Sequence, residues 1–164
     1  MADARSPIGR SPETALIRPA EAADLAAVTE IVRAAFRPYV SRIGREPGPM
    51  GDDHADLIAA GRLHVAVRDG VVVGLVVLIP RGGTLLLDTV AVAPEVQGTG
   101  VGRLLLDFAE RVAVAQGYDT ITLYTNEAMT EAIALYRRLG YAETECVEEK
   151  GFRRVYMRKP LSRP

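Results

Sequence analysis

Three glycines spaced two residues apart form the part of the chain best suited to bind an anion. The segment reads Gln97-Gly98-Thr99-Gly100-Val101-Gly102-Arg103. Glycine permits left-handed backbone conformations and a close approach of ligand to backbone, and the first turn of a helix leaves N–H groups unpaired at the positive end of its dipole. These features predict a phosphate-binding turn to which Arg103 adds a cation. The structural alternative is a tight chain reversal that needs glycine only for its geometry.

Two common phosphate-binding motifs do not fit this segment. A Walker loop requires lysine and then serine or threonine after its last glycine, but Gly102 is followed by Arg103-Leu104. A dinucleotide-binding turn requires Gly-x-Gly-x-x-Gly after the first strand of a parallel βαβ unit, with an acidic residue after the second strand. Here the spacing is Gly-x-Gly-x-Gly, and Asp119 comes before the next expected strand. The sequence therefore disfavours both an NTPase and a dinucleotide-binding protein.

The segments on either side of the glycine-rich turn predict a mixed α/β fold. The turn joins an apolar strand at residues 84–92 to an amphipathic helix that begins near residue 101 and ends before Gly117. Asp69-Gly70 separates two β-branched runs, so residues 63–92 are expected to form a three-stranded antiparallel meander. Further strands are expected at residues 15–18, 120–124, 142–148 and 152–158, and further helices at residues 22–36, 53–60 and 129–139.

Composition and charge narrow the class of protein. The 164 residues are 48% hydrophobic and 25% charged, which fits a single globular domain at residues 14–164 after a mobile tail at residues 1–13. A net charge of −1 and the lack of an apolar leader or span predict a cytoplasmic protein with no nucleic-acid or membrane partner. Cys146 is expected to be buried, and His54 and His64 stand apart, so no metal site is expected.

Two segments together resemble the GNAT superfamily of acetyl-CoA-dependent N-acetyltransferases. The first is Gln97-x-x-Gly100-x-Gly102 after Val90-Ala91-Val92-x-Pro94, which is similar to the pyrophosphate loop of that family. The second is residues 132–141, Ala-Ile-Ala-Leu-Tyr-Arg-Arg-Leu-Gly-Tyr, which resembles the family's later helix. With the opening Leu-Ile-Arg-Pro at residues 16–19, the resemblance covers about residues 15–161. It implies a mostly antiparallel central sheet flanked by helices, with a splayed central strand pair.

The resemblance implies acetyl-CoA as the cosubstrate, held in the splayed gap. Its pantetheine arm would lie along the backbone of Val90, Ala91 and Val92, with an N–H near Val92 facing the thioester oxygen, where an aligned donor stabilises the developing oxyanion. The pyrophosphate would be cradled by Gln97, Gly98, Thr99, Gly100, Val101, Gly102 and Arg103.

Three side chains are implied in the chemistry. Tyr136 would protonate the departing thiolate, because a phenol is protonated at neutral pH; from spacing alone it would only pack on the apolar face of its helix. Asp88 has even spacing from Val90 on the central strand and could help remove the amine proton, or it could be a carboxylate satisfied within the strand. Asn126 could contact the cofactor, cap the following helix, or do both.

The acceptor is expected beside the irregular segment at residues 39–54. Arg42 and Arg45 would suit a carboxylate-bearing amine such as an amino acid, whereas Asp52-Asp53 would suit a cationic amine. The resulting hypothesis is acetyl transfer to a primary amine of a small molecule or amino acid, by direct attack in a ternary complex. A protein or peptide (N-terminal or lysine) acetyltransferase and a non-catalytic acyl-CoA sensor remain as alternatives, and a homodimer is compatible with all three.

Overall fold

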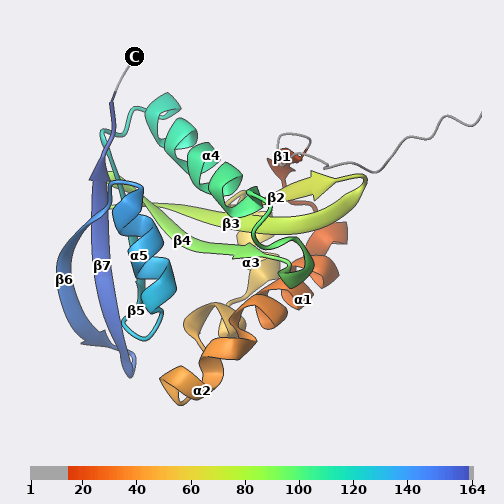
Figure 1. The fold of residues 1–164 in the computed structure, drawn as a ribbon. Coiled ribbons are helices and arrows are strands. Elements are labelled where there is room, and N and C mark those ends of the chain that lie inside the picture. The colour runs from red at the N-terminus through yellow and green to blue at the C-terminus, as the bar shows by residue number, and fades with distance from the viewer. Residues whose placement is uncertain (1–14, 163–164) are drawn as a thin grey trace, which may run out of the picture.

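One seven-stranded sheet organises the protein (Figure 1). The computed structural model describes residues 15–162, and the expected tail at residues 1–13 lies outside them. The strands are β1 (Leu16–Pro19), β2 (Leu63–Arg68), β3 (Val71–Arg81), β4 (Thr84–Val92), β5 (Thr120–Asn126), β6 (Ala142–Glu149) and β7 (Phe152–Pro160). Their order in the sheet is β1-β2-β3-β4-β5-β7-β6. All neighbouring pairs are antiparallel except β4 and β5, so the expected mixed, mostly antiparallel sheet is confirmed.

The meander of β2, β3 and β4 forms as its turn residues predict. Asp69 and Gly70 both have positive φ angles, 55° and 76°. A two-residue turn with this conformation matches the right-handed twist of the strands that it joins. The turn therefore sets the β2–β3 register that pairs Arg68 with Val71.

The strands β4 and β5 part halfway along their length. Their parallel pairing covers only Leu85–Leu87 of β4 and residues 121–123 of β5, although both strands continue beyond it. Asp88 is the extra residue of a β-bulge, because Val77 pairs with Thr89 while Leu78 pairs with Leu87. A bulge bends its strand and increases the local twist. The divergence therefore begins at Asp88, and the expected splayed strand pair is present.

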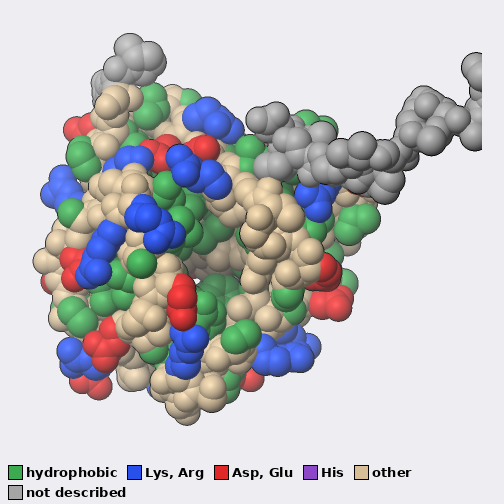
Figure 2. Space-filling model, viewed as in Figure 1, with side chains coloured by type: hydrophobic (Ala, Val, Ile, Leu, Met, Phe, Trp, Pro, Cys, Tyr) green, Lys and Arg blue, Asp and Glu red, His purple; other side chains and the backbone are tan. Residues whose placement is uncertain are grey.

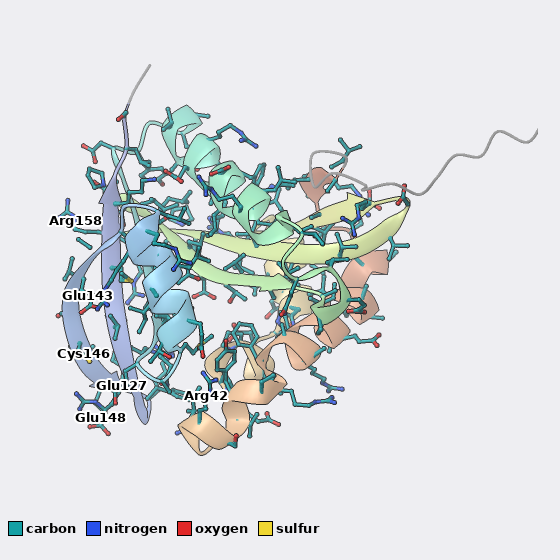
Figure 3. All side chains as sticks on the ribbon, in the orientation of Figure 1. Arg42, Glu127, Glu143, Cys146, Glu148 and Arg158 are labelled. Atoms are coloured by element: carbon teal, nitrogen blue, oxygen red, sulfur yellow. The ribbon has the colours of Figure 1, made fainter. Side chains whose placement is uncertain are left out.

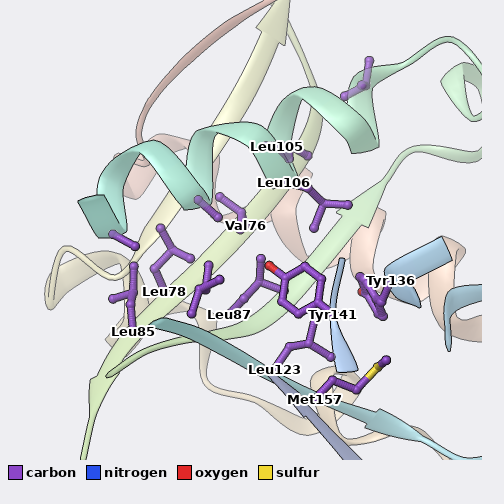
Figure 4. Close-up of a cluster of buried hydrophobic side chains, with 14 of the residues drawn as sticks. Val76, Leu78, Leu85, Leu87, Leu105, Leu106, Leu123, Tyr136, Tyr141 and Met157 are labelled. Carbon is purple, nitrogen blue, oxygen red and sulfur yellow. The ribbon is translucent and has the colours of Figure 1, made fainter. Parts of the chain in front are cut away.

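Helices cover both faces of the sheet (Figure 1). They are α1 (Leu25–Phe36), α2 (Val40–Ile43), α3 (His54–Ala59), α4 (Val101–Ala115) and α5 (Thr130–Arg138). One apolar cluster joins α4 and α5 to β3, β4, β5 and β7, and Figure 4 shows its side chains, including Tyr136 and Tyr141. A second cluster packs α1 on the opposite face. No helix within residues 15–162 is long and apolar enough to cross a membrane.

Gly74 on β3 allows α4 to pack closely against the meander. A Cβ atom at this position would lie 3.0 Å from Leu105 Cδ1 and 3.1 Å from the carbonyl oxygen of Ala91. Both distances are too short for an ordinary carbon contact, and one of the two atoms belongs to the backbone of β4. The missing side chain of Gly74 therefore brings the start of α4 next to the end of β4.

Two local expectations from the sequence are wrong. Cys146 lies exposed on β6, the edge strand of the sheet, rather than buried (Figure 3). Asn126 does not cap α5, because the N-cap position of that helix is Met129. The Asn126 side chain instead accepts a hydrogen bond from the Ala128 N–H at 2.9 Å, within the turn that precedes the helix.

Candidate active site

The glycine-rich turn presents unpaired backbone donors at the start of α4. Gly98 and Gly100 have φ angles of 80° and 95°, a region that other residues rarely adopt. The first intrahelical bond runs from the Leu104 N–H to the Gly100 carbonyl oxygen at 3.0 Å. The N–H groups of residues 101–103 therefore have no partner within the helix and are available to a ligand.

Two side chains of the turn hold its shape rather than reach outward. Gln97 Nε2 donates to the Val92 carbonyl oxygen at 3.1 Å, and Thr99 Oγ1 donates to the Val96 carbonyl oxygen at 2.6 Å. Arg103 is exposed and lies 3.5 Å from Asp107 one helical turn later. Backbone N–H groups are thus the donors that the turn leaves unpaired, and Arg103 is an exposed cation beside it that does not line the cavity described below.

Backbone groups of β4 face the gap left by β5. The Ala93 N–H donates to the Val73 carbonyl oxygen of β3 at 2.9 Å. Because backbone polar groups alternate in direction along a strand, those of Ala91 also face β3, while those of Val90 and Val92 face away from it. The bond from Gln97 to the Val92 carbonyl agrees with this alternation. Of the three expected residues, Val90 and Val92 therefore offer N–H and C=O groups to the gap.

A cavity of about 380 Å³ runs from the glycine-rich turn along this gap. Figure 2 shows the corresponding hollow at the centre of the face in view, with hydrophobic side chains on its walls. Its lining includes Val90, Val92, Gln97, Gly98 and Gly102 at the turn end, and Asp88, Tyr124, Phe152 and Arg154 at the other end, with Tyr136 and Asn126 on its α5 side. The structure thus brings together most of the residues that the sequence singled out.

Tyr136 lies on α5, where it packs in the core and also lines the cavity. Its hydroxyl forms no hydrogen bond to another residue of the described chain, and burial raises its pKa to about 12. Tyr141 packs edge-on against it, with ring centroids 5.8 Å apart, but does not line the cavity. Tyr136 is therefore a protonated phenol with its donor free.

Asp88 accepts hydrogen bonds at both carboxylate oxygens. The Tyr124 hydroxyl donates to Oδ1 at 2.8 Å, and the Thr89 hydroxyl donates to Oδ2 at 3.2 Å. Burial, followed by the charge of Asp88, raises the pKa of Tyr124 well above its usual value. Tyr124 therefore stays neutral and keeps donating to Asp88, which orients the carboxylate at the bulge.

Two residues at the Asp88 end of the cavity, Tyr124 and Arg154, were not predicted from the sequence. Tyr124 reads as an ordinary aromatic residue of a strand, and Arg154 lies thirty residues further along, among several other arginines. Their relation arises from the sheet, in which β7 pairs with β5 and the Arg154 guanidinium stacks over the Tyr124 ring, 4.5 Å from its centroid. No local pattern in the sequence could have identified this pair.

Asn126 is half-buried at the point where β5 ends, and it lines the cavity. Its side-chain oxygen is held by the Ala128 N–H. The side-chain nitrogen has no hydrogen-bond partner among residues 15–162, so it is free to donate to a carbonyl group in the cavity. Met129, which also lines the cavity, stands seven residues before Tyr136.

The segment at residues 39–54 closes the acceptor end of the cavity. Arg42 of α2 donates to both carboxylate oxygens of Glu131 on α5, at 2.9 and 2.8 Å (Figure 3). Arg45 donates to the Lys150 carbonyl oxygen at 3.3 Å and stacks over the Phe152 ring at 4.2 Å. Both arginines expected to bind a substrate carboxylate therefore have partners within the protein.

The two neighbouring aspartates of residues 39–54, Asp52 and Asp53, have different surroundings. The Asp53 carboxylate caps α3 by accepting from the Asp56 N–H at 3.0 Å. Partial burial, followed by the negative charge of Asp88, raises the pKa of Asp52. His54 is buried at the start of α3, and His64 packs against Phe108 with ring centroids 5.0 Å apart. Neither histidine lines the cavity.

Comparisons with known proteins agree with this geometry. A mycothiol acetyltransferase of Jonesia denitrificans is 38% identical over 66 residues, which are 40% of this chain and 21% of that protein. The chain thus matches about a fifth of the length of this relative. The crystal structure of PaiA N-acetyltransferase from Thermoplasma acidophilum in complex with coenzyme A has a TM-score of 0.73 at 17% identity, over 89% of this chain and 98% of that one.

A second solved structure, the ribosomal-protein-alanine N-acetyltransferase of Brucella melitensis, has a TM-score of 0.72 at 27% identity, over 89% of this chain and 99% of that one. The model of the acetyltransferase (GNAT) family matches residues 25–141. This range runs from α1 to the end of the α5 region and includes the glycine-rich turn, the splayed strands and Tyr136. The chain belongs to the acetyltransferase (GNAT) family.

Proposed function

We propose that the protein transfers the acetyl group of acetyl-CoA to a primary amine of a small molecule or an amino acid. The observation that carries this proposal is one continuous cavity that joins the glycine-rich turn, the β4–β5 gap, Tyr136 and Asp88. No cysteine, serine or histidine of residues 15–162 lines this cavity. The lining thus lacks a cysteine–histidine or serine–histidine pair for a covalent acetyl-enzyme, which favours direct attack of the amine within a ternary complex.

The donors around the turn and along β4 suit the parts of acetyl-CoA. The N–H groups of residues 101–103 suit the pyrophosphate, and the outward-facing groups of Val90 and Val92 suit the amides of the pantetheine arm. Val92 lies next to the turn, because Gln97 bonds to its carbonyl and a Cβ on Gly102 would lie 3.6 Å from its side chain. An arm that starts at the turn therefore carries the thioester beyond Val92, and we assign the thioester oxygen to the Val90 N–H.

Tyr136 is the proposed general acid. When bound, acetyl-CoA supplies an acetyl group activated as a thioester, and the C–S bond breaks as the C–N bond forms. The sulfur then needs a proton, and the free hydroxyl of Tyr136 in the cavity can donate it. Its pKa of about 12 keeps the phenol protonated at neutral pH. The burial that raises this pKa also raises that of a thiolate formed beside it, so the two groups remain matched.

Asp88 is the group proposed to bind the ammonium of the acceptor and to help remove its proton. An alkylammonium has a pKa near 10.4 and must lose a proton before it can attack. The Asp88 carboxylate lines the cavity and is held at a fixed angle by Tyr124 and Thr89. It can hold the ammonium next to the thioester and pass its proton to solvent, which leaves the neutral amine in place.

The alternative acceptor is the amine of a protein or peptide. The similarity to the ribosomal-protein-alanine N-acetyltransferase of Brucella melitensis favours it. The two bridges from residues 39–54, Arg42 to Glu131 and Arg45 to Lys150, tie this segment to α5 and to the β6–β7 turn at the acceptor end, which disfavours a wide groove for a polypeptide. A non-catalytic acyl-CoA sensor is a third reading, although such a protein would have no need of the free Tyr136 hydroxyl.

The test is thiol release from acetyl-CoA across matched small amines, amino acids and peptides, with the product identified by mass. We expect release with small acceptors and intersecting initial-rate patterns, which a ternary complex gives and a covalent acetyl-enzyme does not. Release with peptides only would move the assignment to a protein acetyltransferase. Tight acetyl-CoA binding without release for any amine would identify a sensor.

A further inference from the structure

Arg154 presents an unpaired guanidinium to the acceptor end of the cavity. It is half-buried on β7 and lines the cavity. Within residues 15–162 its side chain forms no ion pair and no hydrogen bond, although the other half-buried cation of the strand, Lys159, pairs with Glu110 at 2.7 Å. An arginine side chain has five N–H donors, and those of Arg154 are unsatisfied by the protein.

Two aromatic rings hold this guanidinium in position. Its Cζ atom lies 4.5 Å from the centroid of the Tyr124 ring and 5.6 Å from that of Phe152. Gly48 of η4 (Gly48–Gly51) also lies beside it, where an added Cβ would be 3.6 Å from Arg154 Nη2. No side chain from Gly48 can cover the charge. Stacking fixes the guanidinium plane while its edge keeps free donors, an arrangement suited to a carboxylate.

Tyr124 links this cation to the acidic group of the site. Its ring carries Arg154, and its hydroxyl donates to Asp88 at 2.8 Å. The Tyr124 side chain thus lies between the positive Arg154 and the negative Asp88 on the wall of one cavity. Asp52 lies outside the cavity lining, and its charge interacts with both Asp88 and Arg154.

We propose that the acceptor is an α-amino acid whose carboxylate binds Arg154 and whose ammonium lies against Asp88. This inference rests on the proposed acetyl transfer and specifies its substrate. Charge complementarity carries it: a diamine would place a second cation beside Arg154, and a peptide N-terminus has an amide where this arrangement needs a carboxylate. Arg42 and Arg45 do not line the cavity, and Arg42 is already paired with Glu131.

The cavity wall also indicates which side chain the amino acid carries. Tyr39, Met129 and Phe152 line the cavity together with Ile43 and Pro47. These five side chains are apolar or aromatic, and the one carboxylate beside them in the lining, Glu131, is already paired with Arg42, so a charged side chain packed here would lose its hydration without gaining a free partner. We therefore expect leucine, methionine or phenylalanine to be better acceptors than lysine or glutamate.

The kinetic test compares each of these three amino acids with its carboxamide and with its decarboxylated amine. For the wild type we expect kcat/KM to be about 10- to 100-fold higher for the acid than for the amide, which is the usual contribution of a charge-assisted hydrogen-bonded pair. Arg154→Gln should abolish this preference, and Arg154→Lys should keep part of it. Arg153→Gln is the matched control, because Arg153 is exposed and pairs with Glu127 away from the cavity.

A binding measurement separates this inference from the proposed function. Calorimetry of the CoA-bound protein with the same acids and amides requires no turnover. Acid-selective binding that Arg154→Gln abolishes, without acetylation of any amine, would uphold the carboxylate site and reject the acetyl transfer. Acetylation of acids and amides at equal rates would uphold the acetyl transfer and reject the carboxylate site. If Arg154→Gln does not fold, the wild type is compared with Arg154→Lys instead. Equal acid-to-amide ratios of kcat/KM in these two proteins would overturn the inference.

Discussion

Replacing Tyr136 by phenylalanine tests the chemistry of the site most directly. The hydroxyl of Tyr136 has no hydrogen-bond partner in the described chain, so its removal breaks no structural bond, and Figure 4 shows its ring packed within the core beside Tyr141. We expect kcat to fall by about 100-fold or more, because general acid catalysis typically contributes a factor of 10² to 10⁴. Affinity for acetyl-CoA should change little, since the turn and β4 carry that binding.

Tyr141→Phe is the matched control. Tyr141 is 3% exposed, and its buried hydroxyl has no hydrogen-bond partner among residues 15–162. An unsatisfied buried polar group costs about 1–3 kcal/mol, so this variant should be more stable than the wild type. For a chain of this length, a gain of about 1 kcal/mol raises Tm by roughly 2–4 °C. Activity should be unchanged, because Tyr141 does not line the cavity.

The pH dependence of kcat follows from the same residue. A tyrosine with a pKa near 10 would be half ionised at pH 10, and a general acid of that kind would lose activity there. Burial raises the pKa of Tyr136 to about 12, so its protonated form persists. We therefore expect kcat of the wild type to stay level from about pH 8 to 10.

The assays are thiol release at saturating acceptor, thermal unfolding followed by circular dichroism, and equilibrium binding of acetyl-CoA. Full activity in Tyr136→Phe would refute the assignment of the acid. So would an equal loss of activity in Tyr141→Phe, because the effect would then come from disturbed packing. A fall in kcat by half near pH 10 would show that Tyr136 is not shielded as the structure indicates.

Three further substitutions test the elements that position the site. Gly74→Ala puts a methyl group 3.1 Å from the Ala91 carbonyl oxygen, so chemical denaturation should show a loss of about 1–3 kcal/mol, and an unchanged midpoint would contradict the close packing of α4. The Cβ of Gly102→Leu meets only an ordinary contact with Val92, and we expect acetyl-CoA affinity to fall by about tenfold or more in equilibrium binding, with Tm measured beside it as the control for folding; unchanged affinity would reject the turn as the pyrophosphate site. Asp24→Asn should lower stability at pH 7 by about 1–3 kcal/mol in urea titrations, because it weakens the paired hydrogen bonds from Arg18. Those bonds, with one from the Glu21 N–H, hold the pKa of Asp24 below its usual value, so their contribution is present above about pH 4 and is lost as the pH falls through the lowered pKa; a stability difference that grows in acid would contradict this sign.

Patterns of residues that are close in sequence predicted the elements well. The helix α4, the β2–β3 hairpin and the glycine-rich turn each depend on neighbouring residues, such as Asp69 with Gly70 and Gly98 with Gly100. Their conformations are set by local φ preferences and by the spacing of apolar side chains, and both are visible in the sequence. The position of Tyr136 on the cavity wall could also be anticipated, although only through the family resemblance.

Relations between distant residues could not be predicted in the same way. The sequence left open whether Arg42 and Arg45 would bind a carboxylate or Asp52 and Asp53 a cationic amine, and in the fold Arg42 pairs with Glu131 and Arg45 donates to the Lys150 carbonyl. Cys146 was expected to be buried because cysteine usually is, yet it lies on the edge strand β6, which no further strand covers. In both cases the outcome depends on which elements become neighbours, and single-residue tendencies carry no such information.

The sequence by itself therefore determined the family, the glycine-rich turn and the strand that leads to it, because local backbone preference and a short motif specify each of them. Only the tertiary structure decided which residues come together at the acceptor end of the cavity. The bulge at Asp88 parts β4 from β5, and the pairing of β5 with β7 stacks Arg154 on Tyr124. The position of a charge relative to another depends on strand order and register, which arise when the whole sheet assembles around its two apolar clusters.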